Sequence, residues 1–103
     1  MRACGLSDGD YTLGGQDVKV VGKLATLKSD GAIAGSVTNL MDCMRTAVKE
    51  MGIPLESAVA AATMNPAKSV GLYEQYGSIT EGKIANVVLL DEDLNIKKII
   101  ING

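Results

Sequence analysis

The sequence of 103 residues predicts a mixed fold of the α/β or α+β class, because stretches of different character follow one another along the chain. Before residue 31, apolar and polar side chains alternate between glycine-rich turns, which is typical of strands. Residues 39–72 place apolar side chains at helical spacing between capping residues. From residue 77 onwards, short apolar runs separated by turns indicate strands again.

The first part of the chain predicts a strand hairpin. Residues 1–10 are rich in turn-forming residues and are expected to form a loop, and a strand is expected to begin at Tyr11. Residues 16–21 and 24–27 are expected to pair, since the two residues between them suffice for a tight turn. Gly22 can adopt the positive φ that a type II′ turn requires at its first central position.

Residues 31–36 are expected to form a short loop that leads from the strands into the helices. Gly31 and Gly35 have no Cβ atom, so the main chain at these positions can approach another molecule closely. Such a loop can recognise a ligand through its backbone. It is also an ordinary way to join a strand to a helix, and the residues alone favour this second interpretation.

The first helix is expected between Asn39 and Gly52. Asn39 is a good N-cap, Asp42 lies three residues later as in a capping box, and Gly52 is a suitable C-terminal stop. Apolar side chains at helical spacing form one stripe along it. The stripe consists of Leu40, Met44, Ala47, Val48 and Met51.

Two shorter helices are expected to follow. Pro54 suits the first position of the second helix, where a missing N–H has no consequence. The third helix is expected to have Asn65 as its N-cap, Pro66 as its first residue and Gly71 as its stop. The second helix has a thin, alanine-rich apolar face, which consists of Leu55, Ala58, Val59 and Ala62.

The last part of the chain predicts strands. Residues 77–85 are expected to form a short strand and a turn, and residues 85–90 and 96–101 are expected to pair as a hairpin. Two or three strands are not stable alone in water. This end of the chain is therefore expected to pair with further strands.

Composition excludes several classes of function. The net charge of -2 and the pI near 5.0 give no basic surface for nucleic acid or for an anionic membrane, so neither is expected as a partner. The chain has no histidine, which excludes histidine-based general base catalysis and removes the commonest metal ligand. Carboxylates and two separated thiols remain, so a complete hydrolytic site is not expected here, and we assign no catalytic residue and no metal ligand to this chain.

Two cysteines indicate a reducing compartment. Cys4 and Cys43 lie far apart, without a CxxC pattern, and are expected to be free thiols. The start of the chain shows no signal-peptide pattern. No apolar run approaches the roughly 20 residues that a membrane-spanning helix needs. The expected location is cytoplasmic.

Two motifs near the C-terminal end carry a family resemblance. Residues 63–72 contain the run Asn65-Pro66-Ala67, and residues 77–91 contain Gly82-Lys83 followed by Ala85-Asn86. Both resemble the end of the metal-dependent amidohydrolases. Upstream, residues 1–15, residues 31–36 and the helix after them, with its Arg45 and Val48, are similar to the N-acetylglucosamine-6-phosphate deacetylase family. The resemblance covers essentially the whole chain.

The resemblance implies a TIM-like barrel joined to a small β-sandwich. It also implies a divalent metal, zinc or similar, that activates water to attack the N-acetyl group, giving glucosamine 6-phosphate and acetate. In that family the metal ligands, a Glu and two His, lie well upstream, and the acid/base Asp lies just before the stretch that matches Met1. By this resemblance the chain corresponds to the last third of the enzyme, binds no metal itself and is inactive alone.

The resemblance also divides the chain into three segments. Residues 1–35 would hold the strand hairpin and a substrate loop, residues 36–76 the last barrel helices, and residues 77–103 strands of the sandwich. The loop that matches Ile33, Ala34 and Gly35 contacts the sugar phosphate substrate in the family. For the complete enzyme, the resemblance therefore favours the interpretation that the loop binds a ligand over the interpretation that it only joins a strand to a helix.

The chain departs from the family pattern in small ways. Ser7 stands where a proline is usual, and Asn86 replaces a commoner aspartate. Four aspartates could be imagined as acid/base groups, but their turn, cap and loop contexts favour structural roles. These are Asp8, Asp10, Asp42 and Asp91.

One alternative remains open from the sequence. The chain could be a freestanding α+β interaction module without catalysis. If the chain is part of the enzyme, apolar faces such as Leu40 with Met44, or Val87 with Leu89, are cut from their partners and need cover, so a homo-oligomer is expected.

Overall fold

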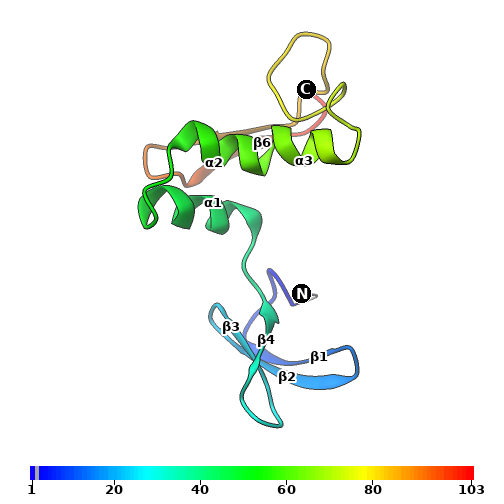
Figure 1. Ribbon diagram of the computed structural model, residues 1–103, viewed down its shortest axis with the longest axis vertical. Helices are drawn as coiled ribbons and strands as arrows, with labels where there is room; N and C mark the ends of the chain where they lie inside the picture. Colours follow the sequence, from blue (N-terminus) through cyan, green and yellow to red (C-terminus); the bar gives the residue numbers. More distant parts are fainter. Residues whose placement is uncertain (2) are drawn as a thin grey trace. The chain divides into compact units, whose positions relative to one another are not determined.

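The computed structural model describes Met1 and residues 3–103. Arg2, part of the opening run of the resemblance, lies outside the described residues. Strands and helices occur in separate stretches (Figure 1), so the predicted mixed fold is confirmed. The chain forms two compact units, Met1–Cys43 and Met44–Gly103, which are described in turn.

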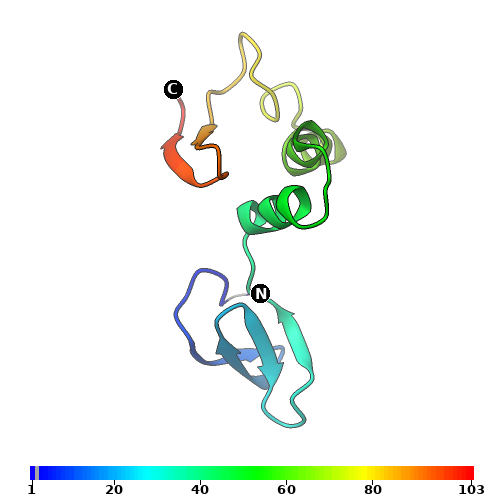
Figure 2. The same cartoon turned by 90° about the vertical axis from the view of Figure 1, so that its left-hand side faces the viewer.

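The first unit is a four-stranded antiparallel sheet in sequential order. Its strands are β1 (Gly9–Leu13), β2 (Gln16–Val21), β3 (Leu24–Leu27) and β4 (Ile33–Ser36), and Figure 2 shows them side by side. The predicted hairpin of β2 and β3 is confirmed, with Val21 opposite Leu24. Gly22 has a φ of 58°, as its turn requires, and its N–H donates to Asp8 Oδ1 at 2.8 Å.

Two predictions for this unit are wrong. Strand β1 begins at Gly9 rather than at Tyr11, because β2 is long enough to pair Gly9 with Val20. Residues 33–36 are a strand rather than a loop, since they pair with the outer edge of β3. Both errors have the same cause. The sequence of these residues suggests turns, but a neighbouring strand offers hydrogen-bond partners to their backbone N–H and C=O groups and so draws them into the sheet.

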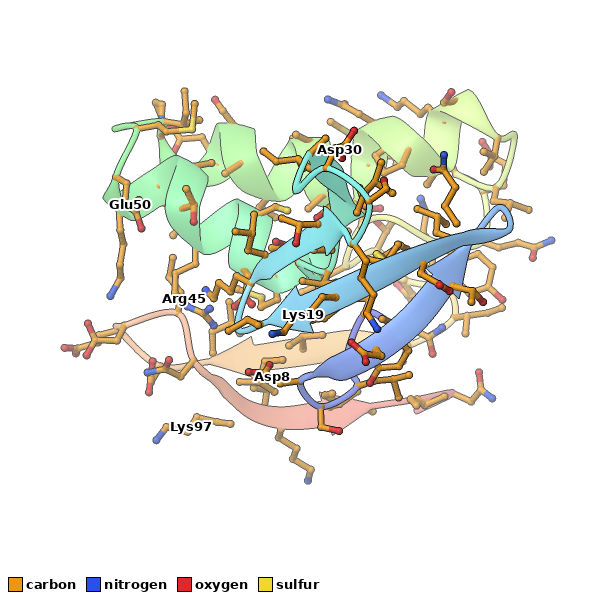
Figure 3. The ribbon with its side chains drawn as sticks, turned by 90° about the horizontal axis from the view of Figure 1, so that it is seen from below. Asp8, Lys19, Asp30, Arg45, Glu50 and Lys97 are labelled. Carbon is orange, nitrogen blue, oxygen red and sulfur yellow. The ribbon has the colours of Figure 1, made fainter. Side chains whose placement is uncertain are left out.

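A small apolar core lies on one face of this sheet. Val18 and Val20 are 0% and 2% exposed, whereas Lys19 between them on β2 is exposed (Figure 3). This alternation follows from the strand period of two. Ala3 and Ala25 complete the buried cluster. Partly buried side chains pack around it: Met1, Tyr11, Leu13, Leu27, Ala34 and Val37.

Helix α1 (Leu40–Lys49) has the predicted caps. The Asp42 N–H donates to Asn39 Oδ1 at 2.8 Å, and Asn39 Nδ2 donates to Asp42 Oδ2 at 3.2 Å. After the helix, Gly52 has a φ of 69°. The predicted apolar stripe is only partly covered, because Met44 is buried while Leu40 and Met51 are 62% and 68% exposed.

Helices α2 (Leu55–Ala62) and α3 (Met64–Ser69) follow with shifted boundaries. Pro54 is the residue before α2 rather than its first residue. Thr63 precedes α3, so the prediction of Asn65 as N-cap and Pro66 as first residue is wrong. Pro66 is tolerated at the third position because N–H groups of the first helical turn have no partner within the helix.

Lys83 makes several contacts that help to hold the segment between α3 and the last strands. Residues 77–85 form turns and bends rather than the predicted strand, and Ile79 is 91% exposed. Lys83 Nζ donates to the carbonyl oxygens of Tyr73 and Tyr76 and lies 3.4 Å from the centroid of the Tyr73 ring. A charged donor and a cation–π contact thus replace strand pairing in this segment.

The predicted C-terminal hairpin is confirmed. Strand β5 (Val87–Leu90) pairs with β6 (Ile96–Ile100) in an antiparallel sheet of two strands, with a register shift at Leu90. Val88 and Ile99 lie opposite each other and are 48% and 56% exposed. Over the described residues, no helix is long and apolar enough to cross a membrane.

We predict that Gly77→Ala destabilises the chain strongly. A Cβ atom at Gly77 would lie 2.8 Å from Ala67 Cβ and 3.1 Å from the Thr63 carbonyl oxygen, at a φ of +90°. Gly82 has a similar φ of +86° but no heavy atom within 4 Å of its Cβ position, so Gly82→Ala is the matched control. We expect a loss in free energy of unfolding of about 3 kcal/mol for Gly77→Ala and about 1 kcal/mol for Gly82→Ala.

Urea denaturation followed by far-ultraviolet circular dichroism measures both losses. Equal losses in free energy of unfolding for the two variants would contradict the steric argument, because backbone strain at a positive φ, which both sites share, would then explain the whole effect.

Candidate functional site

The candidate substrate residues Ile33, Ala34 and Gly35 lie together in strand β4. Gly35 pairs with Ala25 and Ile33 pairs with Thr26, so the register shifts between these pairs. Ala34 is therefore the extra residue of a β-bulge. Bulges redirect side chains and interrupt regular pairing, and they occur often beside binding sites.

The three residues differ in their surroundings. Ile33 is 77% exposed, whereas Ala34 is half-buried against the apolar core of the sheet. Gly35 has a φ of +143°, a conformation that favours glycine. A Cβ atom built there would lie 3.6 Å from Leu13 Cδ2 and 3.9 Å from Met1 Cβ. The segment thus presents its main chain and the Ile33 side chain while Ala34 anchors it.

Hydrogen bonds fix the turn before β4. The Leu27 N–H donates to the Ala32 carbonyl oxygen at 2.8 Å, and the Gly31 N–H donates to the Leu27 carbonyl oxygen at 2.9 Å. Asp30, labelled in Figure 3, accepts the Ala32 N–H at 2.9 Å through Oδ1. The start of the candidate segment is therefore preformed.

Hydrogen bonds also fix the end of β4. The Ser36 carbonyl oxygen accepts a hydrogen bond from the Met1 amino group at 2.6 Å. Ser36 Oγ accepts the Thr38 N–H at 3.1 Å, one residue before the Asn39 cap. A segment held at both ends has little conformational freedom to lose when it meets a ligand.

The four aspartates considered as acid/base groups take structural positions. Asp8 and Asp42 accept or share the hydrogen bonds described above, and Asp10 Oδ2 lies 2.7 Å from Lys28 Nζ. This hydrogen bond to Asp10 raises the pKa of Lys28. Asp91 accepts the backbone N–H groups of two residues in its own turn, at 2.8 and 3.0 Å. The hydrogen bond from the Asn95 backbone is the main reason that the pKa of Asp91 is lowered.

The residues present do not fit a catalytic metal centre. Among the described residues, no three His, Cys, Asp or Glu side chains are grouped so that they could hold a metal ion. Cys4 and Cys43 are both free and exposed, as the sequence predicts. A catalytic zinc ion usually has three protein ligands and one open position.

Both departures from the family pattern keep backbone geometry intact. The Ser7 carbonyl oxygen accepts the Tyr11 hydroxyl at 2.6 Å, and a proline would offer the same carbonyl group. Asn86 Oδ1 accepts the Asn102 N–H at 3.0 Å, and an aspartate carboxylate could accept it equally well. Neither substitution removes an interaction that the structure uses.

Sequence reasoning gave no role to Arg45 or Lys83. Arg45 Nη2 donates to the Leu94 carbonyl oxygen at 3.0 Å, across 49 residues of sequence. Such long-range partners leave no local pattern in a sequence. The only available signal was that both residues lie in the two stretches that carry the family resemblance.

Known proteins match the chain over most or all of its length. The model of the Amidohydrolase family matches residues 16–103. The N-acetylglucosamine-6-phosphate deacetylase of Caenorhabditis elegans is 36% identical over 103 residues, which is 100% of this chain and 25% of that protein. The N-acetylgalactosamine-6-phosphate deacetylase of Escherichia coli O157:H7 is also 36% identical, over 100% of this chain and 27% of that protein.

A solved structure matches the fold as well. The crystal structure of N-acetylglucosamine-6-phosphate deacetylase from Pasteurella multocida superposes with a TM-score of 0.90 at 30% identity, covering 98% of this chain and 26% of that one. The chain spans about a quarter of the length of these relatives, rather than the third that the resemblance implied. These matches confirm the resemblance that the motifs indicate, and the chain belongs to the amidohydrolase family.

Proposed function

We propose that this chain forms part of a metal-dependent deacetylase that hydrolyses N-acetylglucosamine 6-phosphate to glucosamine 6-phosphate and acetate. The observation that carries the proposal is similarity to such deacetylases along the entire chain, at 36% identity to the relative from Caenorhabditis elegans. The TM-score of 0.90 to the enzyme from Pasteurella multocida supports it. A freestanding interaction module without catalysis is the alternative.

In this proposal, β4 supplies part of the substrate site. Ile33, Ala34 and Gly35 would contact the sugar phosphate, mainly through main-chain groups that the bulge and the preformed turn hold in place. A polar ligand fits such a segment because backbone N–H and C=O groups orient it without the conformational cost of ordering long side chains.

The chemical step would use groups outside this chain. The divalent metal, zinc or similar, its ligands and the acid/base aspartate would come from other parts of the protein. The chain itself contains no histidine, and the four aspartates considered as acid/base groups already serve in turns, a cap and an ion pair. Alone, it would be inactive and would bind no catalytic metal.

The three segments would have different places in the complete enzyme. Residues 36–76 would provide the last helices of a TIM-like barrel, and residues 77–103 strands of a small β-sandwich. Residues 1–35 would carry the sheet that leads into the substrate segment. We place the enzyme in the cytoplasm, consistent with two free thiols, and expect neither nucleic acid nor membrane as a partner.

The exposed apolar side chains support self-association. Leu40, Ile99 and Ile101 are 62%, 56% and 71% exposed, and covering apolar area contributes about 25 cal/mol per Å². We therefore propose that the isolated chain forms a homo-oligomer. Light scattering of the purified chain tests this, and one sharp 10.7 kDa species would contradict it.

A second candidate substrate is N-acetylgalactosamine 6-phosphate. The relative from Escherichia coli O157:H7, named for that sugar, shares the same 36% identity as the relative from Caenorhabditis elegans. The two sugars differ only in the orientation of one hydroxyl group. Sequence identity over this quarter of the enzyme therefore does not separate them.

Two chimeras test the proposal and the choice of sugar. In one, this chain replaces its matched quarter of the Pasteurella multocida enzyme, and in the other that of the Escherichia coli O157:H7 enzyme. Acetate release is measured from each sugar phosphate, with both unmodified enzymes as controls. We expect both folded, metal-loaded chimeras to be active and to prefer N-acetylglucosamine 6-phosphate.

Folded chimeras that bind metal but release no acetate would contradict the proposal. A preference of both chimeras for N-acetylgalactosamine 6-phosphate would favour the second substrate. If each chimera instead keeps the preference of its host, the chain does not select the sugar.

We predict that the isolated chain has no deacetylase activity. Purified chain with added Zn²⁺ should release no acetate above the blank, because its described residues form no group of three ligands for a catalytic zinc ion. The Pasteurella multocida enzyme under the same conditions is the positive control. Acetate release by the chain that rises with chain concentration would show this prediction to be wrong.

We predict that a side chain at Gly35 weakens substrate binding. Gly35→Val in the Pasteurella multocida chimera should raise KM about tenfold, since a side chain at a φ of +143° strains and displaces the main chain that would meet the substrate. Gly15→Val is the matched control, because Gly15 also has a positive φ, of +82°, but lies in the turn between β1 and β2. Steady-state kinetics on both variants provides the measurement.

Gly35→Ala serves as a milder variant if Gly35→Val does not fold, since its Cβ would meet Leu13 at an ordinary contact distance of 3.6 Å. An unchanged KM in a folded Gly35 variant would contradict the proposed contact with the substrate and would leave β4 with a structural role alone.

A further inference from the structure

Four consecutive residues of a motif that carries the family resemblance join two segments of the second unit. Lys83 and Ile84 contact the turn at residues 72–76, while Ala85 and Asn86 contact the last two residues of the chain. The two contacted segments lie far apart in the sequence, and the motif lies between them. The sequence pattern marks this motif but does not show what it does.

The turn at residues 72–76 offers a position suited to a cation. The Gln75 and Tyr76 N–H groups both donate to the Leu72 carbonyl oxygen at 3.0 Å, so these residues form one helical turn. Carbonyl groups of a last helical turn have no partner within the helix and attract positive charge. The face of the Tyr73 ring is also negative. A cation therefore fits here better than a neutral donor does.

Lys83 supplies this cation. Its Nζ donates to the carbonyl oxygens of Tyr73 and Tyr76 and lies 3.4 Å from the centroid of the Tyr73 ring, in a partly buried position. An ammonium group carries three donors around one compact charge, so it can serve both carbonyl groups and the ring at once. The next residue adds a backbone contact, because the Ile84 N–H donates to the Gln75 carbonyl oxygen at 3.0 Å.

The second half of the motif binds the end of the chain. The Ala85 carbonyl oxygen accepts the Gly103 N–H at 3.2 Å. Asn86 Oδ1 accepts the Asn102 N–H at 3.0 Å. Strand β5 begins directly after this residue, so the contacts fix the place at which the chain enters the last hairpin.

We propose that residues 83–86 form a clasp in which Lys83 is a positioning residue that must be a compact cation. Its ammonium group holds the turn at residues 72–76 and, through the three residues that follow, the entry into β5. Position 86 requires only a side-chain oxygen, so the aspartate that is commoner in the family serves as well as Asn86. The clasp concerns the conformation of the chain itself and does not depend on the proposed enzymatic function.

Proton NMR of the unmodified 103-residue chain tests the place of the ammonium group. We expect the Lys83 Hε protons to be shifted upfield from those of Lys97 and to show nuclear Overhauser effects to the Tyr73 ring, because they lie near its face. Lys97 is the reference, since its Nζ lies 3.5 Å from Asp91 Oδ2. Lys83 Hε protons at the chemical shift of the reference, without effects to the ring, would overturn the proposal.

Amide hydrogen exchange in matched variants tests the requirement for a compact cation. Lys83→Met keeps an unbranched side chain without the charge, and Lys83→Arg keeps the charge in a planar group. Lys68→Met is the matched control, because Lys68 Nζ also lies over the Tyr73 ring, at 4.8 Å. We expect Ile84 N–H exchange to accelerate about tenfold or more in Lys83→Met, about threefold or less in Lys68→Met, and by an intermediate factor in Lys83→Arg.

Two variants of Asn86 test the second half of the clasp. Asn86→Ala removes the acceptor and should accelerate exchange of the Asn102 N–H about fivefold. Asn86→Asp keeps an acceptor and should leave this rate within about twofold of that in the unmodified chain. The amides of Val18 and Val20, which belong to the core of the first unit, are the internal reference for general effects.

Four results from the variants would contradict the proposal. Unchanged Ile84 N–H exchange in Lys83→Met, or equal acceleration in Lys68→Met, would show that the Lys83 charge does not hold the turn. Exchange in Lys83→Arg as slow as in the unmodified chain would remove the requirement for a compact cation. Equal acceleration of Asn102 N–H exchange in Asn86→Asp and Asn86→Ala would remove the role of the side-chain oxygen. If Lys83→Met does not fold, the NMR signals of the unmodified chain still decide.

Discussion

The arrangement of the candidate site depends on the burial of a few small apolar side chains against one face of the first sheet. Val18 and Val20 on β2 and Ala25 on β3 exclude water there, and Ala3 covers them. Burying a valine completely contributes about 1.5–3 kcal/mol. With no Phe or Trp in the chain, this compact cluster is what fixes β3. Strand β4 takes its position from β3, so the bulge at Ala34 depends on the same cluster.

The second unit is organised by different means. Its buried residues Met44, Ala58, Ala67 and Leu94 are distributed over separate elements. Order there comes from local constraints, such as the close packing at Gly77 and the contacts that Lys83 makes with the Tyr73 and Tyr76 carbonyl groups. Such constraints define conformation without enclosing much apolar surface. This explains why large side chains such as Ile79 and Ile101 remain exposed in this chain.

Local signals predicted the elements whose partners lie close in sequence. The hairpins around Gly22 and residues 91–95 follow from turn chemistry and alternation, and the start of α1 follows from the Asn39 cap. The wrong predictions concern segments whose backbone conformation is set by residues elsewhere in the chain, which a local sequence pattern does not reveal. Residues 33–36 become a strand because the edge of β3 is available, and residues 77–85 fail to become one because Lys83 and close packing at Gly77 hold them in turns.

For the candidate site too, some features could be predicted from the sequence and others only from the structure. Ile33, Ala34 and Gly35 came from the family resemblance, since nothing in their composition distinguishes a binding segment from an ordinary connection. The register shift that makes Ala34 a bulge depends on Ala25 and Thr26, and it could be known only from the paired strands. The absence of histidine, by contrast, was visible in the sequence and removed the commonest metal ligand, while the expected place of the metal ligands came from the resemblance.

The central claim is that the first unit holds the candidate substrate segment as strand β4, paired with β3, within this chain. Cross-strand nuclear Overhauser effects in the isolated chain measure this most directly. We expect a strong effect between the Ala25 and Gly35 α-protons or their amide neighbours, together with strand-like chemical shifts for residues 33–36. Random-coil shifts for residues 33–36, without cross-strand effects to β3, would contradict the account.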